Sequence, residues 1–218
     1  MWSNTMFRPR SLLLSLAAAL FVAWAGAAVA ASSASEVVIA TTDGVIAILK
    51  DASLSKDGKR EHIEQVVYAN VDFDTLSRLV LARNWKQLTP PQQQEFQAEF
   101  KRHLSVTYSR NIDNYRNEGV KVLGEREETR GDRTVQTRVV RGAGGDGDIL
   151  VDYRLRQKDG RWYIIDVIVE GVSLVANFRS QFQDIIAGGS PDVLITLLRD
   201  KNAKGEPVIT PIPIRKGS

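Results

Sequence analysis

The chain contains no cysteine and only two histidines, His62 and His103, among its 218 residues. Without thiols there can be no disulfides, thiol catalysis or sulfur-ligated zinc site, so folding must rely on the apolar core. Each histidine stands alone on a polar, helical stretch, and we expect both to be solvated. Catalysis of the Ser-His or Cys-His type, which needs a histidine base, therefore has almost nothing to work with.

The N-terminal apolar run is too short to cross a bilayer. It extends from Leu12 to Trp24, about 13 residues, whereas a spanning helix needs about 20. Arg8 and Arg10 precede it and Ala28-Val29-Ala30 follows, an order typical of a secretory signal. We expect residues 1–30 to be a signal peptide cleaved near Ala30, with an uncleaved anchor as the alternative. No cysteine follows the run, which excludes a thioether-linked lipoprotein.

The chain has little excess charge of either sign. It carries 29 Lys plus Arg against 26 Asp plus Glu, and losing Arg8 and Arg10 with the signal leaves 27 against 26. Acidic residues are interleaved with the basic ones. Nucleic-acid binding needs a concentrated basic face, so we predict no nucleic-acid partner.

Up to Gly119, apolar residues recur at three- and four-residue steps, which predicts helices. The expected helices are residues 33–53, a short one around residues 63–67, one capped by Asp72 or Asp74 and ending near Trp85, and one of about 25 residues from Pro90 to near Gly119. The start of this fourth helix is clearly marked in the sequence, because Thr89 can be the N-cap, Pro90 fits the first helical position and Gln92 completes a capping box.

After Gly119 the apolar period changes to two, which predicts four strands over residues 120–126, 134–141, 149–156 and 162–169. The short, turn-like connections imply an antiparallel meander. The loop 142–147 is glycine-rich, but it joins two strands and so lacks the geometry of a phosphate cradle. In the third strand Val151 and Tyr153 alternate with Asp152 and Arg154, so one face of the sheet should be wet and the other covered.

Two more helical stripes follow, one after Ser173 and one from Ser190-Pro191. We therefore predict an α+β fold: a four-stranded antiparallel sheet with helices packed over one face, enclosing a hydrophobic pocket. This single domain should span residues 31–200, followed by an extended or mobile tail over residues 201–218.

Asp166 is the candidate for chemistry, because it interrupts the apolar run from Tyr163 to Val169. A carboxylate in an apolar cavity can act as a general base, and small cone-shaped α+β enzymes pair such an acid with a tyrosine such as Tyr153. The alternative, which we favour, is a structural carboxylate on the wet face beside Arg154 or Arg156. Ser173 is better explained as a helix N-cap than as a nucleophile.

Several Phe-rich stripes face a single sheet face of about four short strands. Such stripes form an ordinary core more often than a ligand site. Here, however, there are more large apolar side chains than one core layer needs, which leaves open a cavity between the sheet and the helices. The residues alone also allow an adaptor whose core is simply full and whose exposed faces bind partners.

Two segments carry a family resemblance. LARNWKQLT, residues 81–89, leads into a helix with Gln93, Phe96 and Phe100, and WYIIDV, residues 162–167, is followed by EGVSL and NFRSQF up to residue 182. Together they resemble the MlaC family, the periplasmic phospholipid-binding components, also called toluene-tolerance proteins, of ABC-type lipid transport in Gram-negative bacteria. The likeness spans about residues 36–200; the Pro-Ile-Pro-rich tail after Lys204 departs from it.

The resemblance implies a periplasmic carrier without enzymatic activity or cofactor. It would hold phospholipid acyl chains in the cavity and exchange lipid between an inner-membrane MCE-domain/ABC transporter complex and an outer-membrane lipoprotein-porin complex. The resemblance also implies a monomer with a role in outer-membrane lipid asymmetry. A hopanoid-like lipid is the alternative cargo. Arg83, Lys86 and Arg110 are candidates for a mouth that meets anionic headgroups. The expected lipid-binding residues are Phe73, Leu76, Phe96, Phe100, Leu104, Tyr108, Val139, Val151, Tyr153, Ile164, Val167, Val169, Val172, Leu174, Phe178 and Phe182.

Overall fold

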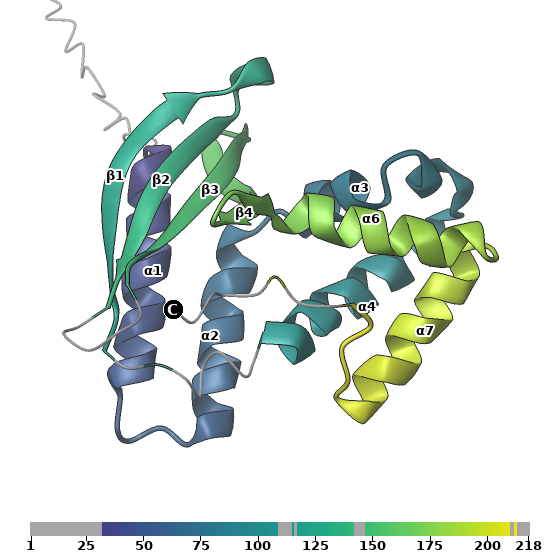
Figure 1. The fold of residues 1–218 in the computed structure, drawn as a ribbon, viewed down its shortest axis with the longest axis horizontal. Coiled ribbons are helices and arrows are strands. Elements are labelled where there is room, and N and C mark those ends of the chain that lie inside the picture. The colour runs from purple at the N-terminus through teal and green to yellow at the C-terminus, as the bar shows by residue number, and fades with distance from the viewer. Residues whose placement is uncertain (1–31, 109–114, 116, 142–146, 210–211, 213–218) are drawn as a thin grey trace, which may run out of the picture. The chain divides into compact units, whose positions relative to one another are not determined.

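The computed structural model describes residues 32–108, 115, 117–141, 147–209 and 212 (Figure 1). The predicted signal peptide and most of the glycine-rich loop lie outside this part of the chain. Among the described helices, none combines the length and apolarity needed to cross a membrane. The architecture is α+β, as expected, with one antiparallel sheet and helices on either side of it in the chain order.

The helices before the sheet are α1 (Ala34–Lys50), α2 (Lys56–Asn70), α3 (Phe73–Leu81), the 3-10 helix η1 (Ala82–Gln87) and α4 (Pro90–Tyr108). Ser33 and Glu36 form a capping box on α1, and Asp72 caps α3 by accepting from the Thr75 amide. Two expectations were wrong. The second helix has 15 residues rather than one or two turns, and the fourth ends before Tyr115, which is not helical.

The sheet has five strands in the order β1-β2-β3-β4-β5, each antiparallel to the next. They are β1 (Gly119–Glu127), β2 (Arg133–Val140), β3 (Ile149–Lys158), β4 (Arg161–Val169) and β5 (Val172–Ser173), with the short 3-10 helix η2 (Thr129–Gly131) between the first two. Asp159 and Gly160 both have positive φ, as a two-residue hairpin of the primed type requires.

The fifth strand was not expected. Glu170 and Gly171, which lie between the fourth predicted strand and the helix after Ser173, both have positive φ and reverse the chain within two residues. Val172 and Ser173 therefore pair with Val169 and Ile168 before α6 begins. This adds one short strand and leaves the fold class unchanged.

A register shift in β4 decides where Asp166 points. Arg154 pairs with Asp166, but the next residue of β3, Leu155, pairs with Ile164, so Ile165 is the extra residue of a bulge. Simple alternation puts Asp166 and Ile164 on one face. The bulge instead turns Ile164 toward the core with Leu155 and leaves Asp166 beside Arg154.

Two separate apolar cores hold the domain together. The first, here called the sheet core, packs α1 against the covered face of the sheet and consists of Ala34, Val37, Val38, Val135, Leu155 and Ile164. The second, the helical core, joins α3, η1, α4, α6 (Leu174–Ala187) and α7 (Pro191–Lys204), helices that lie together in Figure 1. Val71, between α2 and α3, packs against both cores.

The described residues beyond 200 differ in part from the predicted extended or mobile tail. The expected boundary at residue 201 falls inside α7, which continues to Lys204 and ends on Gly205 in the left-handed conformation. Beyond it, Ile209 belongs to the helical core and Ile212 is also buried. Hydrophobic packing therefore fixes the described part of the segment beyond α7.

His103 contradicts the expectation of a solvated side chain, because it is fully buried on α4. Its Nε2 accepts from the Val208 amide at 3.2 Å, so the proton lies on Nδ1, 2.9 Å from Asn202 Oδ1. Asn202 in turn donates to the Glu99 carbonyl and carboxylate. This chain of hydrogen bonds ties α4, α7 and the segment after α7 together. His62, by contrast, is exposed as expected.

Candidate functional site

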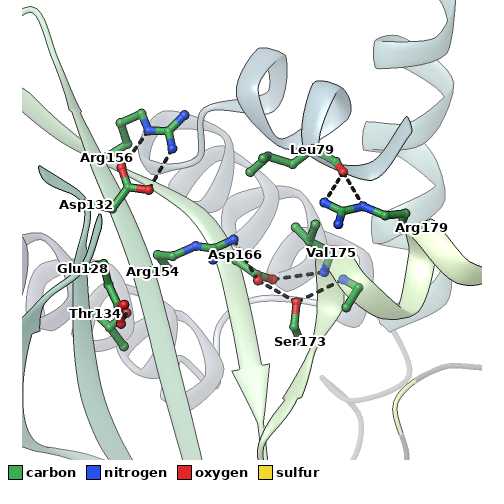
Figure 2. Close-up of polar contacts among 11 residues, drawn as sticks. Leu79, Glu128, Asp132, Thr134, Arg154, Arg156, Asp166, Ser173, Val175 and Arg179 are labelled. Atoms are coloured by element: carbon green, nitrogen blue, oxygen red, sulfur yellow. Dashed lines mark hydrogen bonds and ion pairs between the residues drawn. The ribbon is translucent and has the colours of Figure 1, made fainter. Parts of the chain in front are cut away.

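Asp166 holds the strand-turn-helix from β4 to α6 in place (Figure 2). The buried carboxylate accepts from the Ser173 hydroxyl at 2.6 Å, from the Val175 amide at 3.0 Å and from Arg154 Nη2 at 3.3 Å. Ser173 Oγ also accepts from the Ala176 amide and so caps α6, as predicted. The carboxylate is thus satisfied by structural partners beside Arg154, as we favoured, but it is buried rather than on a solvent-exposed face.

The arrangement expected of an enzyme, Asp166 beside Tyr153 in a cavity, is not formed. Tyr153 pairs with Val167, whereas Asp166 pairs with Arg154 one position along the ladder. Neighbouring positions on a strand point to opposite faces, so the two side chains lie on opposite sides of the sheet. Within the described residues, moreover, no group of three or more His, Asp or Glu side chains could hold a metal ion.

Four phenylalanines at the centre of the helical core pack against one another. Phe96, Phe100, Phe178 and Phe182 are each 0 % exposed. Phe100 stacks on Phe96 at 5.5 Å between ring centroids and meets Phe178 edge-on at 5.0 Å. Rings this closely packed leave no surface for a ligand. These four predicted lipid-binding residues, with Leu76, lie inside the dry core that joins α3, α4 and α6.

Arg179 adds a polar anchor to the same interface. Its guanidinium donates from Nε to the Leu79 carbonyl at 2.8 Å, which satisfies a free carbonyl in the last turn of α3 (Figure 2). The NFRSQF segment thus contributes two core rings and one helix-capping arginine. Its side chains are explained by the packing of α6 on α3.

A different set of apolar side chains keeps partly exposed surface along the flanks of the two cores. Phe73, Leu104, Tyr108 and Leu174 border the helical core, and Tyr153 and Val167 border the sheet core. Burial raises the pKa of Tyr153 to about 12, although part of its side chain remains accessible. These residues are thus among the apolar side chains that keep accessible surface at the borders of the two cores.

Helices α1 and α2 contribute apolar residues that sequence analysis did not single out. Helix α2 has no fully buried residue, and its Ile63, Val66 and Val67 are half-buried. Val45 and Ile48, in the second half of α1, are half-buried as well. Their helical spacing was visible in the sequence, but the same spacing is expected of a residue in an ordinary core.

The remaining predicted residues are distributed over the sheet. Ile164 lies in the sheet core, Val151 is buried, Val139 and Val169 are half-buried, and Val172 is 45 % exposed. Arg83 and Lys86, proposed for a headgroup mouth, are exposed on η1 at the edge of the helical core. Arg110 lies outside the described residues.

The chain is similar to known proteins over most of its length. The profile of the MlaC protein family matches residues 40–200, which confirms the resemblance drawn from the sequence. The toluene tolerance protein ttg2D of Pseudomonas putida is 28% identical over 171 residues, covering 76% of this chain and 78% of the relative.

Similarity extends to a solved structure, that of a phospholipid-binding protein from Ralstonia solanacearum in complex with a phospholipid. It is 27% identical, with a TM-score of 0.72, and the alignment covers 80% of this chain and 99% of the other. The two proteins therefore share the fold across nearly the whole of that relative.

Proposed function

Because this chain belongs to the MlaC family, we propose that it binds phospholipid acyl chains in an apolar pocket and carries the lipid through the periplasm without performing chemistry on it. The observation that carries the proposal is the phospholipid complex of the Ralstonia solanacearum protein, whose whole fold this chain shares. The signal-like N-terminus, cleaved near Ala30, would supply export.

The half-buried side chains on the flanks of the two cores are the best candidates for the pocket wall. We assign this role to Leu104, Tyr108, Tyr153, Val167 and Leu174, together with Val66 and Val67 of α2. The buried phenylalanines of the helical core would support this wall from behind. The proposal thus narrows the expected lining to residues that keep accessible surface without a ligand.

The energetics favour a pocket of this kind. Burial is worth about 0.8 kcal/mol per methylene, so two acyl chains of about 15 methylenes each amount to roughly 24 kcal/mol. That is too much to expose to water in transit. A carrier must nearly match this free energy with an aliphatic and aromatic wall. Its polar contacts to the lipid must also be few and weak enough to allow release. The inner-membrane MCE-domain/ABC transporter complex and the outer-membrane lipoprotein-porin complex would be the two exchange partners.

The test is lipid extraction from protein purified from a bacterial periplasm. Native mass spectrometry should show a copurifying phospholipid, and the lipid mass would separate a glycerophospholipid from a hopanoid-like cargo. An empty protein that also takes up no lipid from phospholipid vesicles would refute the proposal and favour an adaptor with a full core.

A matched pair of variants locates the pocket. Leu104→Asp places a charge on the half-buried flank of α4 and should abolish the bound lipid. Leu123→Asp places the same charge on β1, where the side chain is 50% exposed, and should leave lipid binding unchanged. Equal lipid content in both variants would mean that the wall lies elsewhere.

A further inference from the structure

Lys101 of α4 has an unusual setting for a lysine. Its Nζ lies 3.6 Å from the centroid of the Tyr68 ring on α2 and 5.4 Å from that of Phe73 on α3. The two rings meet edge-on at 5.5 Å and so form a corner around the ammonium. Aromatic faces attract a cation, and they do so more strongly as water is excluded.

No carboxylate of the described residues lies within ion-pair distance of this ammonium. Several other basic side chains of the domain that are partly buried do have such a partner, as Arg154 has in Asp166 and Arg156 in Asp132. Among the described residues, the half-buried Lys101 ammonium contacts the two aromatic rings. An aromatic ring compensates the charge of a partly buried ammonium less completely than a carboxylate does. The three N–H donors of the ammonium remain available for a ligand.

One carboxylate of α2 near this corner is already engaged. Glu64 of α2 accepts a hydrogen bond from the Ser105 hydroxyl of α4. Burial is the main cause, and the Glu64 carboxylate the second cause, of the rise in the pKa of Tyr68 to about 12. Glu64 is therefore held by Ser105 and by the Tyr68 hydroxyl.

The position of Lys101 on α4 relates it to the proposed pocket wall. Leu104 and Tyr108 follow three and seven residues later, so all three side chains lie on one face of the helix. Both apolar members of this row are half-buried, and Phe73, under the ammonium, borders the helical core. The row thus changes from a cation to apolar groups over about 10 Å of helix, which matches the change from headgroup to acyl chain in a phospholipid.

We propose that Lys101 binds the phosphate group of the phospholipid headgroup, an inference that rests on the proposed function. On binding, the ammonium exchanges the faces of Tyr68 and Phe73 for charge-assisted hydrogen bonds to phosphate oxygens, which are stronger than a ring contact at a partly exposed site. The acyl chains then run past Leu104 and Tyr108. Lys101 gives selectivity for a phosphate-bearing lipid over a neutral one.

The experiment compares two soluble short-chain lipids that differ in the phosphate. Dioctanoyl phosphatidylglycerol and dioctanoylglycerol are titrated into the mature protein and into Lys101→Gln, Lys101→Arg and the control Lys121→Gln, an exposed lysine of β1. Lys101→Gln should bind phosphatidylglycerol about tenfold more weakly, the effect of losing a hydrogen bond to a charged group, and dioctanoylglycerol unchanged. Lys101→Arg and Lys121→Gln should behave like the wild type.

The outcomes separate the two proposals. A wild-type protein that binds neither lipid refutes the proposed function itself. If the wild type binds both lipids and Lys101→Gln binds phosphatidylglycerol equally well, or loses both lipids in parallel, only the role of Lys101 is refuted. Binding of inorganic phosphate that depends on Lys101, with unchanged phosphatidylglycerol binding, would assign the lysine to free phosphate and likewise refute the headgroup site.

Tyr68→Leu supplies a second control. It removes the ring that holds the ammonium but leaves Lys101 in place, so the preference for phosphatidylglycerol over dioctanoylglycerol should persist. Loss of that preference in Tyr68→Leu, with its retention in Lys101→Gln, would mean that the aromatic corner rather than the lysine recognises the headgroup. Thermal unfolding of each variant, with its dioctanoylglycerol affinity, shows that the pocket is intact.

Discussion

Phe100→Ala distinguishes a core residue from a pocket residue more sharply than any other single change. From the sequence, Phe100 is an expected lipid contact; in the structure it is 0% exposed at the centre of the helical core. It contacts Phe96, Phe178 and Phe182, with ring centroids 5.0–5.8 Å away. We expect the variant to lose stability and to keep its lipid affinity.

The expected loss of stability is about 3–5 kcal/mol, the usual cost of truncating a fully buried phenylalanine to alanine. The upper part of that range is appropriate, because the three surrounding rings are held on α4 and α6 by the rest of the helical core and cannot easily close the void. Each ring pair also adds about 0.5–1.5 kcal/mol beyond burial. A domain whose stability lies in the middle or upper part of the usual range of about 5–15 kcal/mol keeps most of this variant folded at room temperature.

Urea unfolding followed by tryptophan fluorescence measures the loss, and titration with dioctanoyl phosphatidylglycerol measures the affinity of the folded protein. Phe100→Leu is the matched control, since it nearly conserves volume and should cost less than about 1.5 kcal/mol. The reasoning is refuted if Phe100→Ala is as stable as the wild type but binds lipid more weakly, because the ring would then face the ligand.

Three further changes probe the polar and backbone features of the fold. Asp166→Asn should destabilise the domain by about 1–2 kcal/mol in urea unfolding, because the buried acceptor of Ser173 and Arg154 loses its charge; unchanged stability would contradict its anchoring role. Burial lowers the pKa of His103, so the folded state binds its proton less readily than the unfolded state, and stability should be full above about pH 6.5 and fall by up to about 1.4 kcal/mol per unit below it; His103→Gln should show a shallower decline between pH 7 and 5, and an identical slope would exclude His103 as its source. Ala82→Gly should stabilise by about 1 kcal/mol in thermal unfolding, because Ala82 has φ 49° and ψ −120°, a conformation costly for any residue with a Cβ; a lower midpoint would show that the strain is absent.

The periodic signals in the sequence predicted most of the fold. The change from helical to strand period at Gly119, the Asp72 cap and the Asp159-Gly160 hairpin are all present, because each depends on residues close together in the chain. The fifth strand escaped prediction because two residues are too few to show a period. His103 escaped because its partners, Asn202 and Val208, are about 100 residues away.

For the candidate site, the sequence alone separated apolar from polar residues. It did not separate residues of the proposed pocket wall from residues of the helical core. Phe100 and Leu104 belong to the same helical stripe, one turn apart, and nothing in their spacing distinguishes a ring sealed by α6 from a side chain on an open flank. Nothing in the sequence singles out Lys101, on the same helix. Its aromatic neighbours come from α2 and α3, about 30 residues earlier in the chain.

The sequence by itself thus determined the α+β class, the element order and the family, since local patterns and two diagnostic segments carry that information. Tertiary structure alone decided that Asp166 turns away from Tyr153, through a bulge at Ile165, and that the apolar residues divide into two cores with half-buried flanks. The physical reason is that burial depends on which distant elements meet, and register on a single inserted residue, neither of which a local pattern records.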